Sequence, residues 1–114
     1  MKVLPLLALL LTSAPAFAGP RGPGVKLEVL RSHGTRATVR VTNAGVRRAS
    51  YHADAYDPQG RRLEQVRVSP PTFSLSRNRT REVRFHNLPP IPLYLCATAI
   101  VSPSLSLRSC VHRD

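Results

Sequence analysis

Two cysteines are the residues of this chain whose chemistry is most informative. Cys96 and Cys110 are its only cysteines, and the stretch that holds them, YLCATAIVSPSLSLRSC, has turn-forming residues near its middle. If this stretch folds as a hairpin, the two thiols face each other and form one disulfide. An intermolecular bridge or two free thiols are the alternatives. We predict the Cys96–Cys110 bridge.

The bridge sets a register for the hairpin. With Cys96 opposite Cys110, the pairing runs to Val101 opposite Leu105 and leaves a three-residue turn, SPS, which is a common hairpin closure. The strand face that does not hold Cys96 is the more apolar, which favours a bridge on the outside of the fold. The Tyr94-x-Cys96 spacing is that of a tyrosine corner, which would place both residues inside instead.

Residues for catalysis or metal binding are sparse. The chain has no G-x-S-x-G, no H-E-x-x-H, no phosphate-binding glycine loop and no C-x-x-C. His52 and Asp54 share one face of an expected strand and could hold a metal with a third ligand, but the other histidines fall on different segments. We therefore predict no catalytic residues, no metal, no cofactor and no small-molecule substrate.

The elements that would position these residues are strands. Short runs alternate apolar and polar residues and are separated by turn residues, and no run has sustained helical periodicity. One of the separating segments, DPQG at 57–60, suits a type I turn. Seven or eight short antiparallel strands predict an all-β sandwich, with a barrel as the main rival. The expected strands are 25–30, 35–43, 49–56, 63–69, 72–75, 81–86, 93–101 and 105–111.

The beginning of the chain has the pattern of a secretory signal peptide. Residues 1–18 hold one positive charge at Lys2, then an apolar run, then small residues at Ala16 and Ala18. An uncleaved anchor is the alternative, but the run is shorter than the roughly 20 residues that span a bilayer. We predict cleavage after Ala18, a flexible leader at 19–24 and one domain at 25–114, which is periplasmic or secreted.

Charge is the strongest signal in the composition. The chain has 17 basic and 6 acidic residues, a formal net charge of +11. Such an excess favours anionic partners, although many charged surfaces are simply solvated. Only Phe85 lies within the arginine-rich segment 79–85, so base-stacking platforms are not evident. One candidate function is therefore a basic surface module that binds an anionic polymer: polysaccharide, lipid headgroups or nucleic acid.

Four segments resemble the N-terminal immunoglobulin-like domain of PapD-like periplasmic pilus-assembly chaperones. They are VRVTN at 39–43, SYHADAY at 50–56, VSPPTFSLSRNRTREVRF at 68–85 and LSLRSCVHR at 105–113. Together they cover most of residues 25–114. The resemblance implies that the sandwich is immunoglobulin-like and that the chain acts by binding rather than by catalysis.

The resemblance also implies a site. In that family the last strand of the domain presents alternating apolar residues to a protein partner, which adds a strand, and basic residues anchor a terminal carboxylate. Here Leu105 and Leu107 match the alternating residues, Arg108 lies near the basic anchor, and Lys26 is the nearest candidate for a second anchor. The family continues into a second domain, and its last two strands usually lack a bridge. We therefore expect a single-domain relative, an envelope-assembly accessory protein that binds a protein or peptide partner by strand addition.

Overall fold

The computed structural model describes residues 21–22, 24–45 and 47–114. The expected signal peptide at 1–18 lies outside the described residues. Every regular element within the described ranges is a β-strand. None of the described residues belongs to a helix long and apolar enough to cross a membrane.

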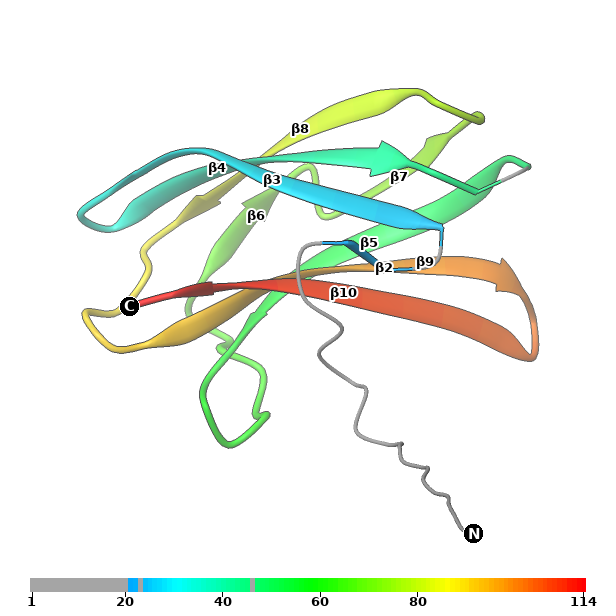
Figure 1. The fold of residues 1–114 in the computed structure, drawn as a ribbon. Coiled ribbons are helices and arrows are strands. Elements are labelled where there is room, and N and C mark those ends of the chain that lie inside the picture. Colours follow the sequence, from blue (N-terminus) through cyan, green and yellow to red (C-terminus); the bar gives the residue numbers. More distant parts are fainter. Residues whose placement is uncertain (1–20, 23, 46) are drawn as a thin grey trace, which may run out of the picture.

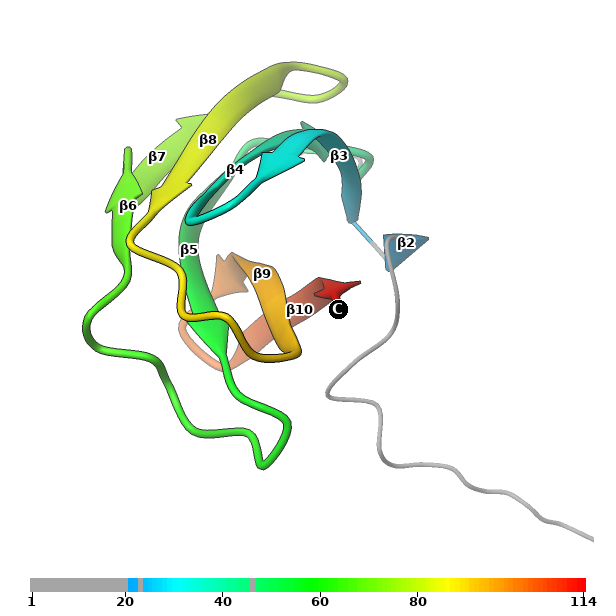
Figure 2. The same cartoon turned by 90° about the vertical axis from the view of Figure 1, so that its left-hand side faces the viewer.

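Two antiparallel sheets face each other (Figure 1). Figure 2 shows β3, β4 and β8 on one side and β5, β9 and β10 on the other. Eight strands and the two-residue β2 confirm the predicted all-β sandwich. The four-stranded sheet has the order β10 (Leu105–Arg113), β9 (Leu93–Ser102), β5 (Ala49–Tyr56) and β7 (Thr72–Leu75). The five-stranded sheet has the order β2 (Arg21–Gly22), β3 (Val25–His33), β4 (Arg36–Asn43), β8 (Thr80–His86) and β6 (Arg67–Ser69).

Period-two alternation places the core between the sheets. Successive side chains of a strand point to opposite faces, so every second residue is inside. Tyr51 alternates with His52 in this way: its ring is 1% exposed and stacks on Phe73 with 5.5 Å between ring centroids. Burying one such large apolar side chain contributes about 1.5–3 kcal/mol. The other inward residues include Val25, Leu27, Val39, Val41, Val83, Phe85, Leu93 and Leu95.

The expected strand at 63–69 is correct only at its end. β6 begins at Arg67, and the preceding residues form a turn in which Val66 N donates to Leu63 O at 3.2 Å. Leu63 and Val66 are half-buried and pack against the core without joining a ladder. Both residues are apolar because they are buried in the connection between β5 and β6. Alternation in the sequence does not distinguish such burial from burial in a strand.

Two further boundaries differ near the start of the fold. The expected strand at 25–30 is too short: β3 continues to His33 and the chain turns at Gly34, whose φ of 60° suits glycine. Arg21 and Gly22 pair with Lys26 and Val25 as a short strand, in the segment where the sequence predicts a flexible leader.

The turn expected at 57–60 is present. Gly60 N donates to Asp57 O at 2.9 Å, which closes the four-residue turn. The Asp57 carboxylate accepts hydrogen bonds from the backbone N–H of Arg61 and of Gln59, each at 2.9 Å. These donors, with Arg61 first, hold the pKa of Asp57 below its ordinary value.

A buried asparagine joins the two sheets at one end of the sandwich. Asn43 ends β4 in the five-stranded sheet and is 1% exposed. Its Nδ2 donates to Leu75 O at 2.8 Å, at the end of β7 in the other sheet, and to Arg47 O at 2.9 Å. Its Oδ1 accepts from Gly45 N at 2.9 Å. The amide thus satisfies three backbone groups.

We expect Asn43→Ala to lower the free energy of unfolding by about 3 kcal/mol, because three hydrogen bonds are lost and backbone groups stay buried without partners. Urea unfolding measures this change. The control is Thr42→Ala on the outward face of the same strand, which should cost less than about 1 kcal/mol. Equal losses for the two variants would show that the amide does not join the sheets.

Candidate functional site

The cysteines form the predicted bridge between adjacent strands. Cys96 and Cys110 are joined and lie opposite each other in the β9–β10 register. The predicted pairing is correct up to Ile100 opposite Ser106. Beyond it, Leu105 pairs with Ser102 instead of Val101, because the register shifts between Leu105 and Ser106. The turn therefore has two residues rather than three.

The bridge lies on the outer face of the four-stranded sheet. Leu95 and Ala97, which flank Cys96 in sequence, belong to the buried core cluster, so Cys96 points the other way. Tyr94 shares this outer face and packs against His112 across the strand pair, with ring centroids 5.0 Å apart. The inward tyrosine corner is therefore wrong, and the outward alternative is correct.

A cation–π contact covers the bridge. Both cysteines are only 2% exposed although they lie on an outer face. The Arg108 guanidinium carbon lies 4.7 Å from the centroid of the Tyr56 ring. Arg108 extends from β10 and Tyr56 from β5, and the register places Cys96 of β9 between them. The contact therefore passes over the disulfide, which explains its burial.

One side of β10 is a free sheet edge. The Cα atoms of Cys96 and Cys110 are 4.0 Å apart, the short spacing of a pair whose backbone groups do not bond each other. The N–H and C=O of Cys110, and by alternation those of Arg108 and Ser106, then point away from β9. Among the described residues no strand hydrogen-bonds to this side, although β2 and β3 pass close to β10. The edge can accept a further strand.

An apolar cavity of about 260 Å³ lies beside this edge, at the end of the sandwich where Asn43 joins the sheets. Leu105 and Leu107 both line it. Leu105 is 49% exposed, whereas Leu107 is partly buried against the core. Tyr51 and Gly24 also line the cavity, and Tyr51 Oη donates to Gly24 O at 3.1 Å. The remaining lining residues are Asn43, Gly45, Arg47, Ala49, Ala99 and Val101.

The structure brings together two of the four expected contact residues. Leu105 and Leu107 share the cavity wall. Arg108 lies on the outer face of the four-stranded sheet against Tyr56, whereas Lys26 is exposed on the five-stranded sheet, opposite Thr42. The two basic residues therefore do not form one site. Tyr51 was missed by the sequence analysis, since side-chain alternation does not reveal that a residue lines a cavity.

His52 and Asp54 share the outer face of β5, as their spacing predicts. His52 Nε2 lies 3.9 Å from Asp54 Oδ2, and Asp54 Oδ1 accepts from Arg62 Nε at 3.1 Å. Among the described residues no three histidine, cysteine or acidic side chains gather in a way that could hold a metal ion. The carboxylate is instead engaged by arginine.

Comparison with known proteins identifies the fold. No protein-family model and no curated protein matches the sequence. Among solved structures, the periplasmic chaperone SfaE superposes with a TM-score of 0.62 at 16% identity over 78% of this chain, and the E. coli chaperone DraB with 0.61 at 18% over 77%. The Salmonella enterica SafA pilin in complex with the SafB chaperone gives 0.64 at 20% over 81%. The chain has a PapD-like, immunoglobulin-like fold.

The PapD-like fold of this chain spans about half the length of those structures. The match covers 55%, 53% and 53% of the three chains.

Burial raises the pKa of Tyr51 to about 12. In the unfolded chain the Tyr51 hydroxyl ionises near pH 10. The stability that neutral Tyr51 contributes to the folded state is therefore complete below pH 10 and is lost as the pH rises toward 12. In absorbance at 295 nm, a tyrosine step should appear near pH 12. Tyr51→Phe should remove this late step and Tyr56→Phe should retain it; a late step that persists in Tyr51→Phe would contradict the prediction.

We expect Arg108→Ala to expose the disulfide. The variant loses a cation–π contact worth roughly 1 kcal/mol, so a soluble phosphine should reduce the disulfide at least about three-fold faster. Alkylation of the freed thiols and mass spectrometry measure the rate. The matched control is Arg61→Ala, which removes an exposed arginine that pairs with Asp57 in the turn after β5. Similar rates for both variants would show that Arg108 does not protect the bridge.

Proposed function

We propose that this chain is an exported, non-enzymatic binding domain, chaperone-like in its mode of action, that engages an extended segment of a protein partner along β10. The main support for the proposal is that the unpaired edge of β10 lies next to an apolar cavity whose wall includes Leu105 and Leu107. Strand addition uses both features: backbone groups give affinity and pockets select side chains.

The backbone of β10 supplies the first part of the interaction. Ser106 and Arg108 direct their N–H and C=O groups away from β9, as the short Cα spacing at the bridge indicates. A partner strand that pairs there forms several hydrogen bonds, each contributing about 1 kcal/mol net. The disulfide strengthens this arrangement because it keeps β10 in register before the partner arrives.

The cavity supplies the second part. Its wall is apolar, and Leu105 at its mouth is about half exposed, so an apolar partner side chain would bury surface that the isolated domain leaves in water. We propose that Leu105 and Leu107 contact that side chain. Arg108 and Lys26 lie on outer faces of different sheets, so each would anchor a separate anionic group of the partner.

Two observations support the type of partner and the compartment. One structure of similar fold is, by its description, a chaperone in complex with a pilin, which is a protein partner. The bridge between Cys96 and Cys110 is of a kind that persists in oxidising compartments outside the cytoplasm. Together with the signal peptide expected at 1–18, the bridge favours an exported, periplasmic or secreted protein.

Site-specific photo-crosslinking tests the proposal in cells that export the full chain. A photoreactive residue at Leu105 should give a covalent adduct of defined mass with one protein, identified by mass spectrometry. The same residue at Ile91, which is 38% exposed at the other end of the fold, is the matched control and should give none. Equal adducts at both positions, or none at Leu105, would contradict the proposal.

A second variant tests strand addition itself. In the Leu105 photoreactive background, Ser106→Pro removes one outward backbone donor while leaving the β9 ladder intact, since proline is tolerated at strand edges. We expect at least a ten-fold loss of the adduct, whereas Ser106→Ala, which retains the N–H, should keep it. Circular dichroism of both purified variants checks that the sandwich is folded. Full retention of the adduct in Ser106→Pro would exclude pairing at this edge.

A further inference from the structure

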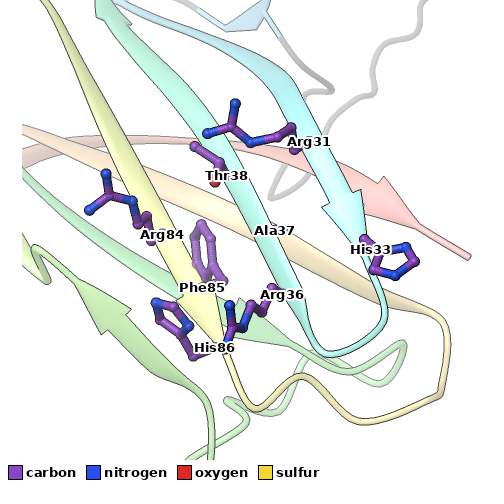
Figure 3. Close-up of a pocket in the computed structure, with 8 residues that line it drawn as sticks. All are labelled: Arg31, His33, Arg36, Ala37, Thr38, Arg84, Phe85 and His86. Atoms are coloured by element: carbon purple, nitrogen blue, oxygen red, sulfur yellow. The ribbon is translucent and has the colours of Figure 1, made fainter.

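A second cavity, of about 360 Å³, lies on the five-stranded sheet at the end of β4 opposite Asn43 (Figure 3). Its lining residues come from β3, β4 and β8. Three are arginines, two are histidines, and none is acidic. They are Arg31, His33, Arg36, Ala37, Thr38, Arg84, Phe85 and His86.

The strand register places the basic residues around Thr38. Arg31 of β3 lies opposite Thr38, and Thr38 lies opposite Arg84 of β8. These side chains point outward, because Val39 and Phe85, their neighbours in sequence, are in the core. Two residue pairs further along, His33 lies opposite Arg36. The cavity therefore combines cationic groups from three strands around Thr38, a residue that is 8% exposed.

Among the described residues, the cavity arginines have no acidic partner, whereas three other surface arginines do. Arg40 pairs with Glu28 at 3.1 Å, Arg62 with Asp54 at 3.1 Å, and Arg61 with Asp57 at 3.3 Å. Within the described part of the chain, no ion pair joins a carboxylate to any of the three cavity arginines (Arg31, Arg36 and Arg84).

The charges next to the cavity do not neutralise it. Glu28 and Glu82 occupy the next row of this sheet face, but Arg40 lies between them and already pairs with Glu28. On the other side, Arg67 of β6 lies opposite His86 and adds a further positive charge. Like charges on neighbouring strands are destabilising, so an anion bound among them would offset that cost.

We propose that this cavity binds the phosphate group of a phosphate ester, carried either by a soluble molecule or by a lipid headgroup. Arginine donates two parallel N–H groups to phosphate oxygens, and the Thr38 hydroxyl is a further donor. Arg31 and Arg84 are two strand spacings apart, roughly 10 Å between backbones, a gap that two arginine side chains can close around one tetrahedral anion. The volume leaves room for part of the alcohol that bears the phosphate.

Titration calorimetry of the exported chain tests the proposal with defined probes. Glucose 6-phosphate is compared with glucose, and vesicles containing phosphatidylglycerol are compared with vesicles of phosphatidylcholine alone. We expect binding to at least one phosphate-bearing probe of net negative charge and none to its neutral counterpart. Binding to the sugar phosphate assigns a soluble ester as ligand, and binding to the anionic vesicles alone assigns a lipid headgroup. Absence of binding to both overturns the proposal.

Matched double variants separate a cavity from general positive charge. Arg31→Gln/Arg84→Gln should weaken binding of the phosphate-bearing probe about ten-fold or more, since hydrogen bonds between charged groups are lost. Arg77→Gln/Arg79→Gln removes the same charge from the turn between β7 and β8 and should change the affinity less than about two-fold. Equal losses in both, or binding restricted to a long polymer such as heparin, would overturn the proposal.

A conservative variant separates loss of binding from loss of the fold. The melting temperature of each variant is compared with that of the parent chain. Arg84→Lys keeps the charge but loses the parallel donor pair, so it should weaken binding several-fold without changing the melting temperature. Unchanged affinity in a folded Arg84→Lys variant would show that Arg84 does not contact the anion and would overturn its assigned role.

Discussion

The buried amide of Asn43 is the interaction on which the arrangement of the two sheets depends. Of the crossings that the chain makes between the sheets, those from β4 to β5 and from β7 to β8 meet at this residue. Besides the side-chain bonds to Leu75 O and Arg47 O, Asn43 N donates to Arg79 O at 3.0 Å and Asn78 N donates to Asn43 O at 2.8 Å. The wall of the apolar cavity is built from this same loop, so the amide that orders the crossings also shapes the proposed contact surface.

A different set of contacts fixes the opposite end. Arg113, at the end of β10, donates from Nη2 to Pro89 O at 2.6 Å and to Ile91 O at 2.8 Å, in the connection between β8 and β9. The disulfide holds the middle of the same strand. β10 is therefore held at its end and centre while one edge stays unpaired by any described strand. A strand held in this way loses little conformational freedom when a partner pairs with it, which favours affinity.

The sequence allowed the strands to be predicted where side-chain alternation reports burial directly, as in β5 and β7, whose bounds were predicted correctly. The register of the β9–β10 hairpin could also be predicted, because a disulfide restricts which residues can face each other. Alternation failed at local irregularities. In β3 it places Leu27, Val29 and then Arg31 on one face, but the register shifts between Val29 and Arg31 and turns Arg31 outward. The phosphate cavity needs that shift and a pairing across three strands, neither of which a single sequence reveals.

The same distinction applies to charge. A net charge of +11 predicts attraction to anions but no place for it, because an arginine acts according to its neighbours. Arg40 is neutralised by Glu28, Arg113 bonds backbone carbonyls, and Arg108 lies on an aromatic ring over a disulfide. Each of these arginines already has a structural partner. The three cavity arginines have none among the described carboxylates and line one cavity, so it is their position together, rather than the total charge, that indicates where an anion would bind.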